Sequence, residues 1–104
     1  TSSLSVTEIS QVLQFPERVV GMHFFNPAEK MLLVEVVRGK KTEDKVSLLT
    51  AAVATKLGKY PIIVEDVPGF LINRILTPYL IEASFLLFEG ASIQEIDNAA
   101  VQFG

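Results

Sequence analysis

The two side chains best suited to acid–base chemistry are His23, the single histidine of the sequence, and Glu35. His23 lies at the end of an apolar segment and directly before a turn, where α/β sheets present their functional groups. Glu35 stands inside the apolar run of residues 31–37, where an unpaired carboxylate would be costly to bury. If the two segments are neighbouring strands, the carboxylate can fix the imidazole tautomer and stabilise the imidazolium. The pair would then be a general base with its orienting group.

Both residues also have plain structural interpretations. A lone histidine is common in a protein core, where backbone groups satisfy its ring nitrogens. Glu35 could instead form an ion pair with Arg38 or Lys30 at the edge of its strand. The distance between the His23 and Glu35 side chains therefore decides between a base with its partner and two unrelated polar groups.

Three further polar residues are less specific by themselves. Asn73 lies among apolar residues in the first turns of a predicted helix, where its amide could face a ligand or bond to a neighbouring loop. Asn26 belongs to an ordinary Asn-Pro turn, and nothing local singles out Ser2. The sequence contains no G-x-G-x-x-G or P-loop pattern, so a nucleotide-phosphate site must lie elsewhere. It also has no cysteine, which excludes a thiolate zinc site, and we expect no metal site.

The elements that must position these residues alternate in the manner of an α/β domain. Strands are predicted over residues 18–25, 31–37 and 61–64. A capping box at Ser5 predicts a short amphipathic helix with Ile9, Val12 and Leu13 on its apolar face. Thr42 is predicted to cap a helix between the last two strands, which favours their parallel pairing by a right-handed crossover. The buried face of that helix is predicted to contain Val46, Leu49, Val53 and Leu57.

The pattern changes after residue 66. Residues 70–89 predict a long helix, which Pro78 should kink or split, and a second capping box at residues 92–95 opens another helix. Strands before this point and helices after it predict a domain boundary, with one domain over residues 1–66 and the start of a helical domain over residues 67–104.

Composition excludes several classes of protein. A net charge of -3 over 104 residues leaves no basic excess to attract nucleic acid or an anionic membrane surface. The most apolar stretch, residues 70–88, is interrupted by charged residues and a proline, so no membrane span is expected. A mean hydropathy of +0.39 is high for a small soluble domain. Together with the absence of an initiator Met and of a polar tail, this value predicts a central fragment of a larger protein.

The residues resemble a known family in order and spacing as well as in type. The segments are His23-Phe-Phe-Asn-Pro27, Leu33-Val-Glu-Val36 and Pro68-Gly-Phe followed by Asn73-Arg74. They resemble the core of the L-3-hydroxyacyl-CoA dehydrogenases, and the resemblance covers essentially the whole chain. Gly58-Lys-Tyr-Pro-Ile-Ile-Val64 is most similar to bacterial multifunctional fatty-acid oxidation complex α-subunits.

This resemblance implies an oxidoreductase of fatty-acid β-oxidation that converts L-3-hydroxyacyl-CoA to 3-ketoacyl-CoA with NAD. It assigns His23 as the catalytic base and Glu35 as its partner. Ser2 would lie near both substrate and cofactor, Asn26 on the cofactor side, and Asn73 on the substrate. It also implies that residues 1–66 end a Rossmann-type NAD-binding domain and that the glycine-rich turn precedes them.

The resemblance carries further expectations about partners and activity. We expect an acyl-CoA substrate, assembly as a homo-oligomer or within a fatty-acid oxidation complex, and a bacterial cytoplasmic location, or a mitochondrial or peroxisomal one in a eukaryote. We expect the isolated 104 residues to be inactive because the main cofactor-phosphate site is missing. Two alternatives stay open: a non-catalytic structural relative of the same fold, and an NAD-dependent dehydrogenase of another small hydroxy acid.

Overall fold

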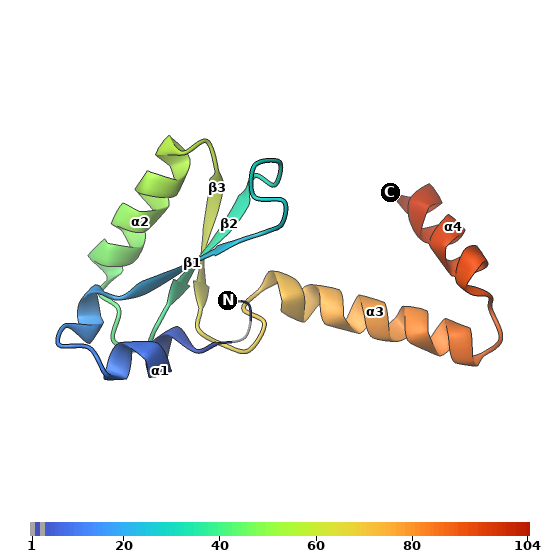
Figure 1. Ribbon diagram of the computed structural model, residues 1–104, viewed down its shortest axis with the longest axis horizontal. Coiled ribbons are helices and arrows are strands. Elements are labelled where there is room, and N and C mark those ends of the chain that lie inside the picture. The colour runs from blue at the N-terminus through green and yellow to red at the C-terminus, as the bar shows by residue number, and fades with distance from the viewer. Residues whose placement is uncertain (1, 3) are drawn as a thin grey trace. The chain divides into compact units, whose positions relative to one another are not determined.

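The computed structural model describes residue 2 and residues 4–104, and its first part is built on one three-stranded sheet in the order β1-β2-β3 (Figure 1). The strands are β1 (Val20–Phe24), β2 (Leu33–Arg38) and β3 (Tyr60–Glu65). β1 and β2 are antiparallel, whereas β2 and β3 are parallel, as the intervening helix predicted. The first strand begins later than expected because Pro16–Arg18 form a short 3₁₀ turn, η1. The α/β fold class is therefore confirmed.

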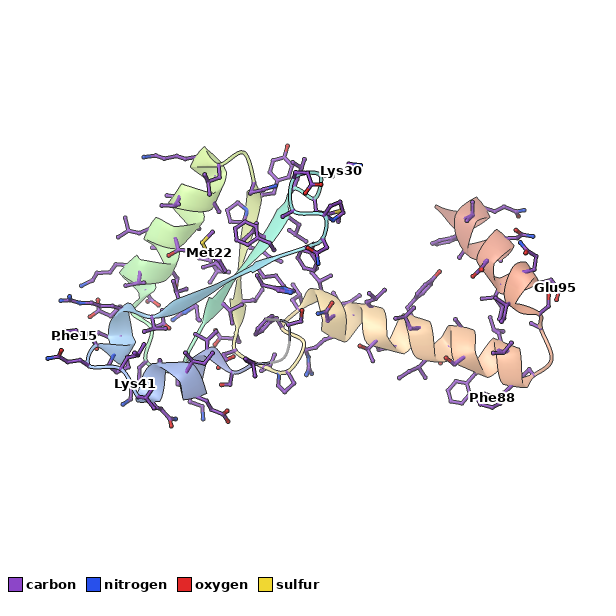
Figure 2. All side chains as sticks on the ribbon, viewed as in Figure 1. Phe15, Met22, Lys30, Lys41, Phe88 and Glu95 are labelled. Carbon is purple, nitrogen blue, oxygen red and sulfur yellow. The ribbon has the colours of Figure 1, made fainter. Side chains whose placement is uncertain are left out.

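Helix α2 (Asp44–Lys56) covers one face of the sheet (Figure 1). Val34 and Val36 of β2 are fully buried, and Ala54 and Ser47 are the buried residues of the helix. Figure 2 shows Met22 between β1 and α2. Small side chains on the inner face of the helix suit a close approach of helix to sheet.

Two expectations about α2 are wrong. Three of the four residues assigned to its buried face are exposed, namely Leu49, Val53 and Leu57. The structure buries the small residues instead, and helical periodicity alone does not say which of two apolar faces meets the sheet. Thr42 does not cap the helix, because its Oγ1 donates to the Val19 carbonyl (2.6 Å) and accepts from the Gly39 amide (2.9 Å).

The opposite face of the sheet packs against α1 (Val6–Gln11) and the loop that follows β3. The buried apolar cluster on this side consists of Val6, Val37, Val64 and Phe70. Ser5 caps α1, as predicted, by accepting from the Glu8 amide at 3.1 Å. The apolar residues predicted to line the buried face of α1 are exposed, namely Ile9, Val12 and Leu13. This short helix buries only Val6 and Ser10.

The chain divides into two compact units, residues 1–72 and residues 73–104. The second unit consists of nearly all of α3 (Ile72–Phe88) and of α4 (Ile93–Phe103). α3 is one continuous helix with Pro78 inside it, so the predicted split does not occur. The capping box at Ser92 is formed in full with Glu95. Phe88 is 87% exposed where α3 ends (Figure 2). Within the described residues, no helix is both long and apolar enough to cross a membrane.

Candidate active site

The structure brings His23 and Glu35 together through strand pairing. The two residues are direct partners in the antiparallel β1–β2 ladder, so their side chains lie on the same face of the sheet. The distance from His23 Nδ1 to Glu35 Oε2 is 2.6 Å, and the two side chains are 9% and 0% exposed. A hydrogen bond this short between buried groups indicates a charge-assisted contact. The structural interpretation of His23 as an isolated core imidazole is therefore wrong.

The second carboxylate oxygen of Glu35 is also fully engaged. Its Oε1 accepts from the backbone amides of Leu71 and Ile72, each at 2.9 Å. These two amides stand at the beginning of α3, where backbone N–H groups have no partners within the helix and favour a negative charge. The second oxygen of the buried carboxylate is thus satisfied without a cationic side chain. The alternative ion pair with Arg38 is not formed, because the Arg38 guanidinium bonds to Asp44.

Ser2 completes the contacts of the imidazole. Its Oγ is 2.9 Å from His23 Nε2, on the side of the ring away from Glu35. Since the carboxylate can only accept, Nδ1 carries a proton, and a neutral imidazole then has its lone pair on Nε2. We assign the Ser2 hydroxyl as the donor to Nε2 in this tautomer. Ser2 is exposed, so Nε2 is the nitrogen open to an incoming group.

Aromatic rings hold the imidazole from its sides. The rings of Phe25 and Phe70 meet it edge-on, at centroid distances of 4.8 and 5.3 Å. Phe70 has a φ of 47°, a left-handed conformation that is strained for a bulky residue, and Gly69 before it has a φ of 75°. This reversal turns the chain so that the next two amides meet Glu35. A cavity of about 160 Å³ beside His23 is lined by residues that include Leu4, Val6 and Phe70.

Two predicted site residues remain, Asn26 and Asn73. Asn26 is exposed in the turn after β1. Asn73 is the first residue of the second compact unit, where its side chain is half-buried and its carbonyl accepts from Thr77 Oγ1 at 2.7 Å. The structure therefore joins Ser2, His23 and Glu35 directly, and leaves the assignments of the two asparagines as predictions.

Sequence reasoning missed Asp66, to which it gave no role. Its carboxylate accepts from Ser5 Oγ (2.7 Å), the Val6 amide (3.1 Å) and the Thr7 amide (2.8 Å). Partial burial raises the pKa of Asp66, but the hydrogen bonds from Thr7, Ser5 and Val6 outweigh it and hold that pKa below its ordinary value. An acidic residue directly after a strand was the only available signal, because its partners are about sixty residues away.

The described residues provide only part of what a dinucleotide would need. Among residues 2 and 4–104, no three His, Asp or Glu side chains gather closely enough to hold a metal ion. The turns of this chain show no glycine-rich cradle at the start of a helix, which dinucleotide phosphates require. What the chain does offer is an open Nε2 beside a hydroxyl. This donor set fits the reacting end of a nicotinamide cofactor and not its phosphates.

The fold and the site define an α/β domain with a buried His–Glu pair that is suited to proton transfer. Residues 1–67 match the NAD binding domain of 3-hydroxyacyl-CoA dehydrogenase, and residues 69–104 match its C-terminal domain. The chain belongs to the 3-hydroxyacyl-CoA dehydrogenase family.

Individual relatives agree with the family. The chain is 50% identical over all 104 residues to the fatty acid oxidation complex subunit alpha of Acinetobacter baumannii and 47% identical to that of Psychrobacter cryohalolentis. It spans only 14% of the length of these relatives.

Solved structures give the same result. The (S)-3-hydroxybutyryl-CoA dehydrogenase of Ralstonia eutropha is 48% identical with a TM-score of 0.87, over 91% of this chain and 34% of that one. A 3-hydroxybutyryl-CoA dehydrogenase of Escherichia coli is 43% identical with a TM-score of 0.85, over 88% of this chain and 20% of that one.

Proposed function

We propose that this chain supplies the proton-transfer site of an enzyme of fatty-acid β-oxidation that oxidises L-3-hydroxyacyl-CoA to 3-ketoacyl-CoA with NAD⁺. The observation that carries the proposal is the buried 2.6 Å contact between His23 Nδ1 and Glu35 Oε2, which leaves Nε2 facing an exposed hydroxyl. This arrangement is that of a general base with an orienting carboxylate. Membership of the family supports the same reaction.

In this reaction, His23 Nε2 accepts the proton of the substrate C3 hydroxyl. The imidazolium that results is stabilised by Glu35, which already receives the Nδ1 proton at 2.6 Å. NAD⁺, when bound, supplies the acceptor for the hydride that leaves C3. Ser2 bonds to Nε2 at 2.9 Å and is placed to donate to the same oxygen once substrate is present. The backbone amides of Leu71 and Ile72 hold the Glu35 carboxylate in position while the proton moves.

The roles of the remaining site residues form part of this proposal. Ser2 contacts both the nicotinamide and the substrate oxygen, and Asn26 lies on the cofactor side. Asn73, from the helical part, contacts the substrate. The domain boundary lies between residues 66 and 67, with the NAD-binding domain before it. The acyl-CoA substrate, homo-oligomer formation or membership of a fatty-acid oxidation complex, and a location in the bacterial cytoplasm follow from the same assignment.

The experiment that tests the proposal uses the full-length protein that carries this segment. Replacing His23 by Gln removes the base and should lower turnover of an L-3-hydroxyacyl-CoA by about 100-fold or more. Glu65 at the end of β3 is exposed, so E65Q serves as the matched control and should retain turnover. Absence of turnover in the wild-type protein would support a non-catalytic relative of the same fold, whereas unchanged turnover of H23Q would show that His23 is not the base. The isolated 104 residues should form negligible NADH.

The second candidate function is that of an NAD-dependent dehydrogenase of another small hydroxy acid. One specific relative favours a substrate other than an acyl-CoA. The 5-formyl-3-hydroxy-2-methylpyridine 4-carboxylic acid 5-dehydrogenase, an NAD⁺-dependent dismutase, is 33% identical with a TM-score of 0.92, over 97% of this chain and 33% of that one. The same fold therefore accommodates, in that relative, a substrate that is not an acyl-CoA. Comparing acetoacetyl-CoA with free 3-hydroxybutyrate decides between the two: turnover of only the free hydroxy acid would replace the acyl-CoA assignment.

A further inference from the structure

Asp66 links two segments that are distant in the sequence. Its carboxylate accepts three hydrogen bonds from residues 5–7, namely from Ser5 Oγ and from the amides of Val6 and Thr7. Its own amide donates to the Arg38 carbonyl at the end of β2, at 3.1 Å. The backbone of Asp66 is therefore anchored to the sheet, and its side chain holds the start of α1.

The segment held by Asp66 is the one that carries Ser2. Ser2 is only three residues before Ser5, and three residues span at most about 10 Å when fully extended. Fixing Ser5 therefore restricts where the Ser2 hydroxyl can lie. In the structure that hydroxyl reaches His23 Nε2 at 2.9 Å. Among the described residues, Asp66 is the only side chain that accepts hydrogen bonds from the backbone amides of Val6 and Thr7.

The loop that begins at Asp66 contacts Glu35 through its last residues. Within it the Phe70 amide donates to the Val67 carbonyl at 2.8 Å, and Gly69 and Phe70 both have positive φ. The amides of Leu71 and Ile72 then donate to Glu35 Oε1. One short loop therefore has Asp66, which holds α1, at its start and has the amides that bind Glu35 at its end.

We infer that Asp66 is a positioning residue of the candidate active site. It fixes the Ser2 segment on the Nε2 side of His23 to the loop that holds Glu35 on the Nδ1 side. The positions of Ser2 and Glu35, the two partners of the imidazole, thus both depend on the Asp66 carboxylate, which does not contact the imidazole itself. The effect of Asp66 on turnover rests on the proposed function, whereas its effect on the geometry around His23 does not.

The first test is spectroscopic and uses the 104-residue chain. Asp66→Asn keeps the shape of the side chain but places an NH₂ group against donors, so some of the three hydrogen bonds must be lost. We expect D66N to shift the ¹⁵N resonance of His23 Nε2 in the direction that Ser2→Ala shifts it. The D66N/S2A double variant should add little to S2A alone. Glu65→Gln, which removes the neighbouring exposed carboxylate, should leave the resonance in place.

An Nε2 resonance that stays at its wild-type position in folded D66N, while S2A moves it, would overturn the inference. A fully additive double variant would overturn it as well. If D66N does not fold, Ser5→Ala removes one of the three hydrogen bonds while the carboxylate remains. S5A should then give a smaller shift of His23 Nε2 in the same direction, and no shift would count against the inference.

The second test is kinetic and uses the full-length protein. D66N should lower kcat on the order of 10-fold and leave KM for the acyl-CoA unchanged. Misplacement of Ser2 and His23 reduces stabilisation of the transition state more than it reduces substrate binding. Wild-type kcat in D66N, together with a large loss in H23Q, would overturn the inference and leave the proposed function intact. An H23Q variant with full turnover would instead overturn the proposed function. The Nε2 resonance would then decide the positioning role by itself.

Discussion

Glu35 lies directly across the antiparallel β1–β2 pair from His23, and its two carboxylate oxygens have separate tasks. Oε2 receives the imidazole Nδ1 at 2.6 Å, while Oε1 receives two backbone amides at 2.9 Å each. Because the Leu71 and Ile72 amides can only donate, the side-chain atom of residue 35 that faces them must be an acceptor. This asymmetry gives the pair a defined tautomer, and it makes substitution of Glu35 informative.

Glu35→Gln should invert the tautomer of His23. The amide oxygen of the glutamine must face the Leu71 and Ile72 amides, so its NH₂ group faces Nδ1. Nδ1 then accepts, Nε2 carries the proton, and the base cannot take another. We expect kcat of the full-length protein to fall roughly 100-fold, within the range for loss of a general base. The ¹⁵N spectrum of His23 checks the tautomer, and an unchanged tautomer would contradict the explanation.

Gly69→Ala should disturb the site, whereas Gly58→Ala should not. Both glycines have a φ of 75°, so each substitution carries the left-handed penalty of about 1–2 kcal/mol for an L residue. Nothing lies within 4 Å of a Cβ built on Gly58, which makes G58A a control for that penalty alone. Only G69A should move the imidazole resonances of His23, through the amides on Glu35. Equal effects of the two variants on His23 would refute the role of the loop.

Gly21→Ala should destabilise the first compact unit through a steric clash with α1. A Cβ at Gly21 would lie 2.8 Å from Val6 Cγ2 and 3.1 Å from Val37 Cβ. We expect the free energy of unfolding in urea to fall by about 1–3 kcal/mol, as for overpacked cores. Val6→Ala removes the nearer methyl, so G21A should cost less in a V6A background. Strict additivity would show that the clash with Val6 is not the cause.

Stability should depend on pH through Asp66. Its pKa in the folded chain is below the unfolded value of about 3.9, so its contribution is present above that value and is lost as pH falls through the folded pKa. At pH 7 we expect D66N to lower the free energy of unfolding by about 1–2 kcal/mol, because hydrogen bonds to a charged group contribute about 1.5–3 kcal/mol and solvent screens part of this at a half-buried side chain. The difference between wild type and D66N, measured by urea unfolding, should shrink on acidification below about pH 5.

A difference that stays constant down to the acid limit would contradict this account. It would mean that the carboxylate charge of Asp66 is not what holds residues 5–7. E65Q provides the comparison here as well, because it removes one negative charge from an exposed neighbour without removing a hydrogen bond found in the structure. Any effect shared by D66N and E65Q belongs to net charge and not to the contacts.

The sequence by itself determined the order of elements and the chemistry of the site. Apolar runs of strand length separated by a helical pattern predict an α/β unit, and the capping motifs at Ser5 and Ser92 predict two helix starts. A carboxylate inside an apolar strand demands a partner, and the sequence left His23, Arg38 and Lys30 as the candidates. These inferences succeed because they depend on local periodicity and on the free-energy cost of burying a charge.

Only the tertiary structure decided which groups meet over long separations. Burial of Ala54 in place of the larger apolar residues of α2 depends on how closely helix and sheet approach. Thr42 bonds to the Val19 carbonyl and not to its own helix because β1 passes beside it. The amides of Leu71 and Ile72 reach Glu35 after a backbone reversal with positive φ at Phe70, a conformation that no local propensity favours. Contacts of this kind form only once packing outweighs the local cost.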